Sequence, residues 1–178
     1  YSSSDPTATD ILFTTMAGRG LRGLVGLTLM DRGAPDDVLL SSSQAIQACE
    51  SLIEKWHGHD KNRLQFCVTP RFAVSCSSEL LTHAGRLAAE HQLPIQTHIS
   101  ENTAEIDAVG RLFPGVRDYL AVYEAHGLAT SRSILAHCIW LSDGEWDRVA
   151  QNQCGVSHCP DSNFFLGSGQ MPIDAARE

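Results

Sequence analysis

Polar residues with hydrolytic chemistry stand where the apolar runs of this chain end. They are a cation, three imidazoles, a carboxylate and an amide: Arg71, His98, Glu101, His137, His158 and Asn163. A neutral imidazole is the commonest biological metal ligand. A carboxylate beside a metal-activated water can serve as a general base. These residue types therefore predict metal-assisted hydrolysis, if the fold brings them together.

The elements that would position these residues repeat one plan, a short apolar run followed by a helix start. We predict strands over residues 22–30, 65–70, 95–99, 134–138 and 155–158. We predict helices over residues 8–18, 43–56, 77–92, 103–112 and about 116–126. Gaps of roughly 20 to 40 residues separate the polar strand ends, and a βα unit needs roughly 30 residues. The order indicates an α/β fold of five parallel βα units.

Two α/β architectures fit this order. In a parallel barrel the carboxyl ends of all strands meet at one active-site face. In an open doubly wound sheet, ligands bind only where the strand order reverses, so residues on four successive strands would not all meet. We therefore expect part of a (β/α)8 barrel. Because a parallel barrel does not close with five strands, residues 1–178 are expected to be one incomplete barrel segment.

Helix boundaries follow from local signals. Thr7 or Thr9 is expected to cap the first helix and Ser43 the second. Asn102 with Glu105, and Ser142 with Glu145, have capping-box spacing. The chain ends are expected to hold the tail of another strand at Tyr1-Ser2 and the start of a helix in 171–178.

Composition narrows the function classes. The 178 residues are 43% hydrophobic and 19% charged, with a formal net charge of −8. We find neither the basic stripe of a nucleic-acid-binding protein nor an apolar stretch near the roughly 20 residues of a membrane helix. The six cysteines form no CxxC pair, and their positions indicate buried free thiols in a reducing compartment. We expect a cytoplasmic protein with no nucleic-acid or membrane partner.

Each candidate has a structural alternative. His98 with Glu101 three residues later suits a metal ligand beside a general base, although a strand histidine can simply be a satisfied polar residue. His137 suits a second metal ligand, a group that orients the attacking water, or a buried histidine bonded to a backbone carbonyl. Arg71 suits a substrate anchor or a salt bridge across the top of the barrel. His158 and Asn163 are expected to support the metal ligands from a tight turn, with direct catalysis by His158 as the alternative.

The pair His57-Gly58-His59 has the spacing of a metal motif but stands elsewhere. It follows a helix and precedes a strand, which places it at the amino-terminal end of the sheet, where residues serve stability. We interpret it as a solvated helix end. The remaining histidines are predicted to lie on outer helices.

Four segments carry a family resemblance. They are T-P-R-F at 69–72, Q-T-H-I-S-E-N at 96–102, L-A-H-C at 135–138 and S-H-C-P-D-S-N at 157–163. In this order and spacing they resemble the guanine deaminases of the amidohydrolase superfamily, over essentially the whole chain. The resemblance implies a zinc-dependent barrel hydrolase, with this chain running from the end of the second strand to the helix after the seventh.

The resemblance also implies residue roles. His98 matches a zinc-binding histidine, Glu101 the proton-shuttling glutamate, and His137 the histidine beside the zinc-bound water. Arg71 and Phe72 match the pair that holds the purine. The family's His-x-His pair and its metal-binding aspartate have no match in residues 1–178, so the metal site is expected to be incomplete and the segment inactive by itself.

Three functions remain open at this point. The first is hydrolysis of guanine to xanthine and ammonia, by a longer protein that forms a homodimer. The second is the same chemistry on another aminopurine, a pterin or a triazine. The third is a non-catalytic α/β segment that packs against a partner chain.

Overall fold

The computed structural model describes residues 2–176, in which parallel strands alternate with helices. The strands are β1 (Gly23–Val25), β2 (Thr28–Leu29), β3 (Leu64–Phe66), β4 (Thr69–Pro70), β5 (Ile95–Ile99), β6 (Ser133–His137) and β7 (Gly155–Ser157). The helices are α1 (Pro6–Gly18), α2 (Ser42–Trp56), α3 (His59–Asn62), α4 (Ser78–Glu90), α5 (Thr103–Leu112), α6 (Tyr119–Ala125), α7 (Asp143–Gln151) and α8 (Pro160–Phe165), with 3₁₀ turns η1 (Asp36–Val38) and η2 (Ala73–Ser75).

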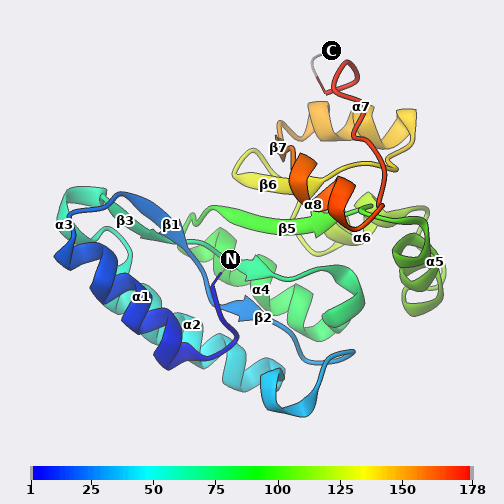
Figure 1. Cartoon of the computed structure of the whole chain (residues 1–178). Helices are drawn as coiled ribbons and strands as arrows, with labels where there is room; N and C mark the ends of the chain where they lie inside the picture. Colours follow the sequence, from blue (N-terminus) through cyan, green and yellow to red (C-terminus); the bar gives the residue numbers. More distant parts are fainter. Residues whose placement is uncertain (1, 177–178) are drawn as a thin grey trace.

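The strands of successive βα units lie side by side. β1 pairs with β3, β2 with β4, and β5 with β6 and then β7, all in parallel. A parallel bridge from Val68 to Ile95 joins the first two pairs to β5. The arrows in Figure 1 run in a common direction, so the carboxyl ends share one edge. The described strands show no reversal of order, which contradicts the doubly wound alternative.

The first two predicted strands are each divided into two short pieces. The break falls at Gly26 in the first and near Cys67 in the second. A Cβ on Gly26 would lie 2.0 Å from the carbonyl oxygen of Cys67. The two backbones approach so closely that only glycine fits, and this approach interrupts the regular ladder.

The strands do not close into a barrel within residues 2–176. The Thr28 N–H donates to the carbonyl oxygen of Ser3 at 2.9 Å, so the chain near Ser3 runs beside β2, where a preceding strand was predicted. Tyr1, the other residue of that prediction, lies outside the described residues. At the other end, residues 173–176 form a turn rather than the predicted helix, and 177–178 are not described.

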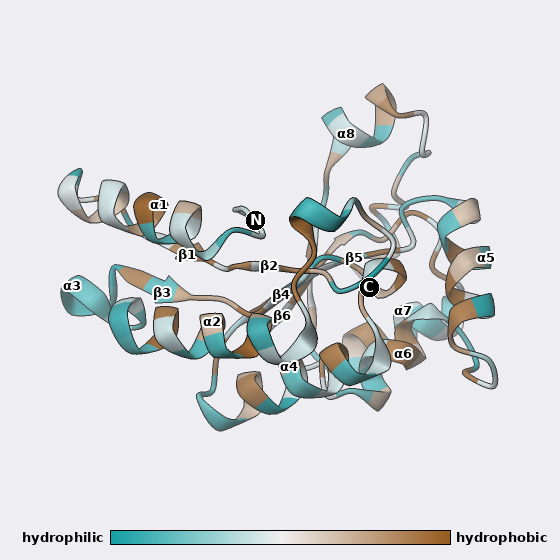
Figure 2. Ribbon diagram, turned by 90° about the horizontal axis from the view of Figure 1, so that it is seen from below, coloured by the Kyte–Doolittle hydropathy of each residue, from teal (hydrophilic) through white to brown (hydrophobic). Residues whose placement is uncertain are grey.

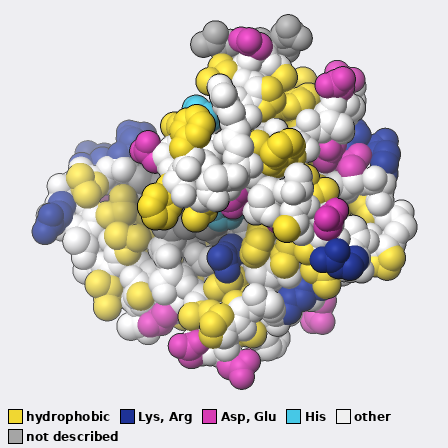
Figure 3. Space-filling model, turned by 45° about the vertical axis from the view of Figure 1, so that its right-hand side comes forward, with side chains coloured by type: hydrophobic (Ala, Val, Ile, Leu, Met, Phe, Trp, Pro, Cys, Tyr) yellow, Lys and Arg dark blue, Asp and Glu magenta, His cyan; other side chains and the backbone are white. Residues whose placement is uncertain are grey.

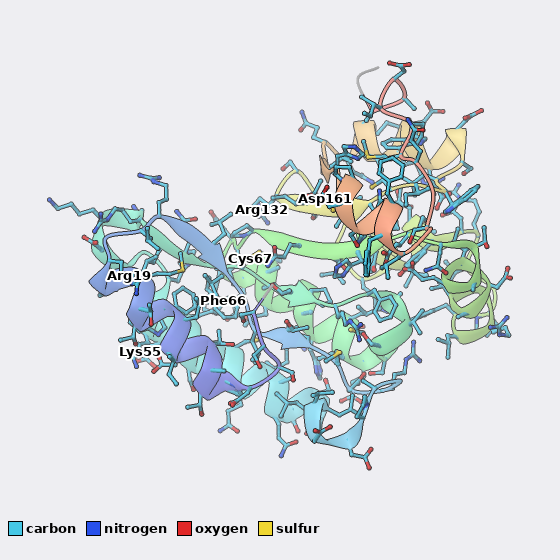
Figure 4. The ribbon with its side chains drawn as sticks, in the orientation of Figure 1. Arg19, Lys55, Phe66, Cys67, Arg132 and Asp161 are labelled. Carbon is cyan, nitrogen blue, oxygen red and sulfur yellow. The ribbon has the colours of Figure 1, made fainter. Side chains whose placement is uncertain are left out.

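Outer helices cover the strands through their apolar sides. Residues of α2 and α4 alternate between brown and teal in Figure 2, so each helix has one apolar and one polar side. Ala45, Cys49, Leu52 and Trp56 of α2 are buried. In Figure 4, Phe66 of β3 lies in the interior while Arg19 and Lys55 lie on the surface of the helix layer. None of the described helices is long and apolar enough to cross a membrane.

Two of the predicted helix caps are wrong. Asp5, not Thr7 or Thr9, accepts the Thr7 N–H, and Pro6 occupies the first helical position, where its missing N–H is harmless. Ser41, not Ser43, caps α2 in a full capping box. In both helices the correct cap lies two residues or more before the predicted one, because the apolar pattern begins only after the first turn.

Two other predicted caps are confirmed. Ser142 and Glu145 form the predicted capping box, and Asn102 accepts the Glu105 N–H. Glu105 itself turns away from its cap residue: its carboxylate accepts the N–H of Glu101 at 3.0 Å.

The end of α8 exposes a contiguous apolar patch. Phe164, Phe165 and Leu166 are 65%, 90% and 63% exposed. Exposed patches of this kind mark interaction surfaces or aggregation sites.

We expect residues 1–178, produced alone, to self-associate in sedimentation experiments. Phe165→Ser should shift the distribution toward monomer, whereas Ile11→Ser, at an exposed apolar residue of α1, should not; equal effects would contradict an origin in this patch.

Candidate active site

Two imidazoles lie side by side at the carboxyl ends of β5 and β6. His98 pairs in register with Ala136, and Ile99 pairs with His137. The ring centroids of His98 and His137 are 5.3 Å apart with an interplanar angle of 23°. The parallel register therefore turns two residues far apart in sequence into neighbours.

Hydrogen bonds set the tautomer of both rings. The Nδ1 of His98 lies 2.6 Å from the carbonyl oxygen of Arg71, which also accepts the backbone N–H of His98 at 3.1 Å. The Nδ1 of His137 lies 2.7 Å from the amide oxygen of Asn163. Because these oxygens only accept, Nδ1 carries the proton and Nε2 carries the lone pair in both rings. This is the usual arrangement behind a metal-binding histidine.

The surroundings of His98 favour its neutral form. Burial lowers the pKa of His98 below its ordinary value, and the neighbouring His137 lowers it further. Only a neutral imidazole can offer a lone pair to a metal. The hydrogen bond to the Arg71 carbonyl raises the pKa of His98, but burial outweighs it.

Glu101 lies beside the two rings at the start of the β5–α5 connection. One carboxylate oxygen of Glu101 is 3.7 Å from Nδ1 of His137 and 3.5 Å from the hydroxyl of Ser168. The preceding residue, Ser100, is left-handed, with φ 50°. His137 is left-handed as well, with φ 75°. Such residues cost about 1–3 kcal/mol each and cluster at functional sites.

Arg71 and Phe72 follow β4, the neighbour of β5. The Arg71 guanidinium carbon lies 4.9 Å from the centroid of the Phe72 ring, and one of its nitrogens is 3.5 Å from the Met30 sulfur. Arg71 is exposed and Phe72 is half-buried. The Arg71 donors and the Phe72 ring therefore lie at the same edge of the sheet as His98.

His158 and Asn163 are placed differently from each other. The predicted tight turn is instead the short helix α8, and Asn163 lies inside it, 1% exposed. Its amide reaches His137, as expected of a supporting residue. His158 is exposed at the end of β7. Its neighbours Ser157 and Cys159, rather than His158, line the cavity next to His98 and His137.

Figure 3 shows histidine side chains at the bottom of a hollow, with acidic and basic side chains beside it and hydrophobic ones around it. Within residues 2–176 no group of three or more His, Cys, Asp or Glu residues is arranged to hold a metal. A catalytic zinc commonly has three protein ligands and one open position. The two lone-pair imidazoles thus fit part of a zinc site.

The pair His57 and His59 lies at the opposite edge of the sheet. His57 ends α2, and His59 pairs with Leu64 at the start of β3. Both are exposed, which confirms their interpretation as a solvated helix end.

Sequence reasoning missed three polar residues beneath the site. Glu105, Tyr119 and Tyr123 are almost fully buried and bond to the backbone of the site loops. A glutamate in the first turn of a helix looks like an ordinary cap. Two tyrosines four residues apart on an amphipathic helix look like core residues. Only the burial of Glu105 distinguishes it from an ordinary cap, and the sequence pattern does not reveal that burial.

The parallel strands are those of an α/β fold, and two imidazoles meet at their carboxyl edge. Residues 6–178 match the model of the Amidohydrolase family, and the chain belongs to that family. Within that family, the chain is similar to guanine deaminases. The chain is 38% identical over 173 residues to the guanine deaminase of Dictyostelium discoideum, covering 97% of this chain and 38% of that protein.

Solved structures agree with the sequence relatives. The E. coli guanine deaminase matches with a TM-score of 0.95 at 36% identity, covering 98% of this chain and 40% of that one. The guanine deaminase from C. acetobutylicum with guanine bound in its active site matches with a TM-score of 0.95 at 34% identity, covering 98% and 42%. The chain therefore spans about two fifths of the length of the relatives it matches.

Proposed function

We propose that this chain is the central part of a zinc-dependent guanine deaminase, which hydrolyses guanine to xanthine and ammonia. The observation that carries the proposal is the cluster of His98, His137 and Glu101, in a chain similar to guanine deaminases over nearly its whole length. His98 and His137 would hold the metal through Nε2. The remaining ligands would come from parts of the relatives' length that this chain does not span.

Zinc, when bound, supplies hydroxide at neutral pH because it lowers the pKa of water to about 7. Glu101 would take up one proton of the attacking water and pass it to the ring nitrogen; the proton of the added hydroxyl would then pass through Glu101 to the amino group, which leaves as ammonia. His137, fixed by Asn163, binds the metal or orients the water. His158, exposed beside β7, belongs to the supporting shell in this proposal.

Substrate binding falls to the β4 edge. The guanidinium of Arg71 can donate a hydrogen bond to a purine carbonyl. Phe72 packs against the purine ring. His98 and Glu101 face the carbon that bears the amino group. Arg71 thus fixes the orientation, and Glu101 acts on the reacting atoms.

The proposal extends to the whole protein. Residues 1–178 would form one segment of a (β/α)8 barrel, from the end of the second strand to the helix after the seventh, in a homodimer. All six cysteines are free thiols, which is typical of a reducing compartment. We therefore place the enzyme in the cytoplasm, with a small purine as substrate and without nucleic-acid or membrane partners.

The test is a substrate panel on the complete protein that contains residues 1–178, loaded with zinc. Guanine, adenine, a pterin and an aminotriazine are offered separately, and ammonia release is measured with product identification. We expect guanine to be converted to xanthine with the highest kcat/KM. A higher kcat/KM on another member of the panel would contradict the substrate, and no turnover on any member would contradict an enzymatic role.

A further inference from the structure

Three buried polar side chains lie directly beneath the candidate site. Glu105 is in the first turn of α5, and Tyr119 and Tyr123 are one turn apart on α6. They are 6%, 2% and 0% exposed. The tyrosine ring centroids are 5.5 Å apart. We call Glu105, Tyr119 and Tyr123 the tyrosine–glutamate cluster.

The carboxylate of Glu105 holds the backbone of Glu101. One oxygen of Glu105 accepts the Glu101 N–H at 3.0 Å, and the other accepts the Tyr119 hydroxyl at 2.6 Å. Each carboxylate oxygen of Glu105 therefore accepts one hydrogen bond, from the Glu101 backbone or from the Tyr119 hydroxyl. Since Glu101 follows the left-handed Ser100, its backbone is constrained on both sides.

The hydroxyl of Tyr123 joins the two loops of the site. It donates to the carbonyl oxygen of His98 at 2.6 Å and accepts the N–H of Ala73 at 3.1 Å. The Tyr119 hydroxyl accepts the same Ala73 N–H at 3.3 Å. Ala73 directly follows Phe72, so one cluster contacts the backbone beside the substrate pair, the metal histidine and the general base.

If the tyrosine–glutamate cluster served only to fill the interior, it would need neither a carboxylate nor hydroxyl groups. A buried carboxylate is expensive to desolvate, and well-packed apolar residues are often as stable or more stable in its place. Burial indeed raises the pKa of Glu105 above its ordinary value. The cluster keeps a polar network whose outer bonds end on the backbones of site residues.

We propose that Glu105, supported by Tyr119, is a positioning residue that aims the carboxylate of Glu101 at the attacking water, while Tyr123 keeps the His98 and Phe72 loops in register. This inference rests on the proposed function. Catalytic groups must be held within about 0.5 Å of their working geometry. A misplacement of about 1 Å can lower the rate about 10²-fold.

The test uses the complete zinc-loaded protein and the variants Glu105→Ala, Glu105→Gln and Tyr119→Phe. Asp10→Ala is the control, because Asp10 also accepts a hydrogen bond from an aromatic residue, the Trp56 indole at 2.7 Å, but joins the outer helices α1 and α2. The measurements are kcat and KM for guanine, zinc content, and hydrogen exchange of the Glu101 amide.

In Glu105→Ala we expect kcat to fall about 10²-fold, with KM and zinc content near those of the wild type, because Arg71, Phe72 and His98 keep their places. Exchange of the Glu101 amide should be faster. Glu105→Gln keeps a carbonyl that can accept the Glu101 N–H and should recover most of the loss. Tyr119→Phe should fall between the two, and it is isosteric enough to fold if Glu105→Ala does not.

Different outcomes overturn different claims. A kcat in Glu105→Ala like that of the wild type, or an equal loss in Asp10→Ala, overturns the positioning role. Unchanged exchange of the Glu101 amide in Glu105→Ala overturns the backbone clamp. A wild-type protein that does not turn over guanine overturns the proposed function, and the catalytic part of this inference with it.

Discussion

Glu101→Gln, in the complete zinc-loaded protein, should lower the turnover of guanine by about 10²–10⁴-fold, the usual contribution of a positioned general acid–base group. Glutamine keeps the size of the side chain and a hydrogen-bonding carbonyl but cannot take up a proton at neutral pH. Since Glu101 is assigned no ligand role, zinc content and guanine affinity should stay near those of the wild type. Ammonia release, metal analysis and equilibrium binding on one preparation measure all three quantities.

Glu54→Gln is the matched control for this variant. Glu54 is exposed on α2, away from the site, and its substitution replaces the same carboxylate by the same amide. Its turnover should equal that of the wild type. Near-normal turnover of Glu101→Gln would remove Glu101 from the mechanism, whereas loss of zinc from that variant would make Glu101 a ligand.

His98→Ala should abolish both metal binding and turnover. Losing a hydrogen-bond partner of a metal ligand lowers metal affinity by about 10–100-fold, and losing the ligand itself should exceed that range. The ring Nδ1 of His98 and its backbone N–H both bond to the carbonyl oxygen of Arg71, which fixes the ring at the end of β5. Zinc per chain after dialysis and guanine turnover provide the measurements.

His91→Ala controls for a general effect of losing a histidine, because His91 is exposed at the end of α4. It should keep its zinc. A second arm uses residues 1–178 alone, which supply at most two of the three ligands typical of catalytic zinc. They should bind zinc weakly, and a stoichiometric four-coordinate zinc in this segment would contradict the assignment of ligands.

Periodicity was sufficient to predict the strands and most helices. β5 was predicted over its full length, and β6 and β7 to within one residue. Each lies between clear helix signals, so local pattern and tertiary structure agree there. The first two strands were predicted too long, because the contact of Gly26 with Cys67 that interrupts them is a long-range feature.

The site was predictable as a set of residues but not as a geometry. The carboxyl-end rule placed Arg71, His98 and His137 at one edge, and the register of β5 with β6 explains why two rings meet. The rule failed to distinguish His158 from its neighbours, since a residue just after a short strand can face either way. The contact of Asn163 with His137 depends on α8, for which an expected turn gave no orientation.

Each described unit after the first pairs its strands with those of the unit before it, and this has a consequence for synthesis on the ribosome. Each pairing closes a loop of only one unit, so its chain-entropy cost is small and nearly the same at every step. Folding from the amino terminus can then add one unit at a time to an existing edge. His98 and His137 would become neighbours as soon as β6 leaves the exit tunnel and pairs with β5.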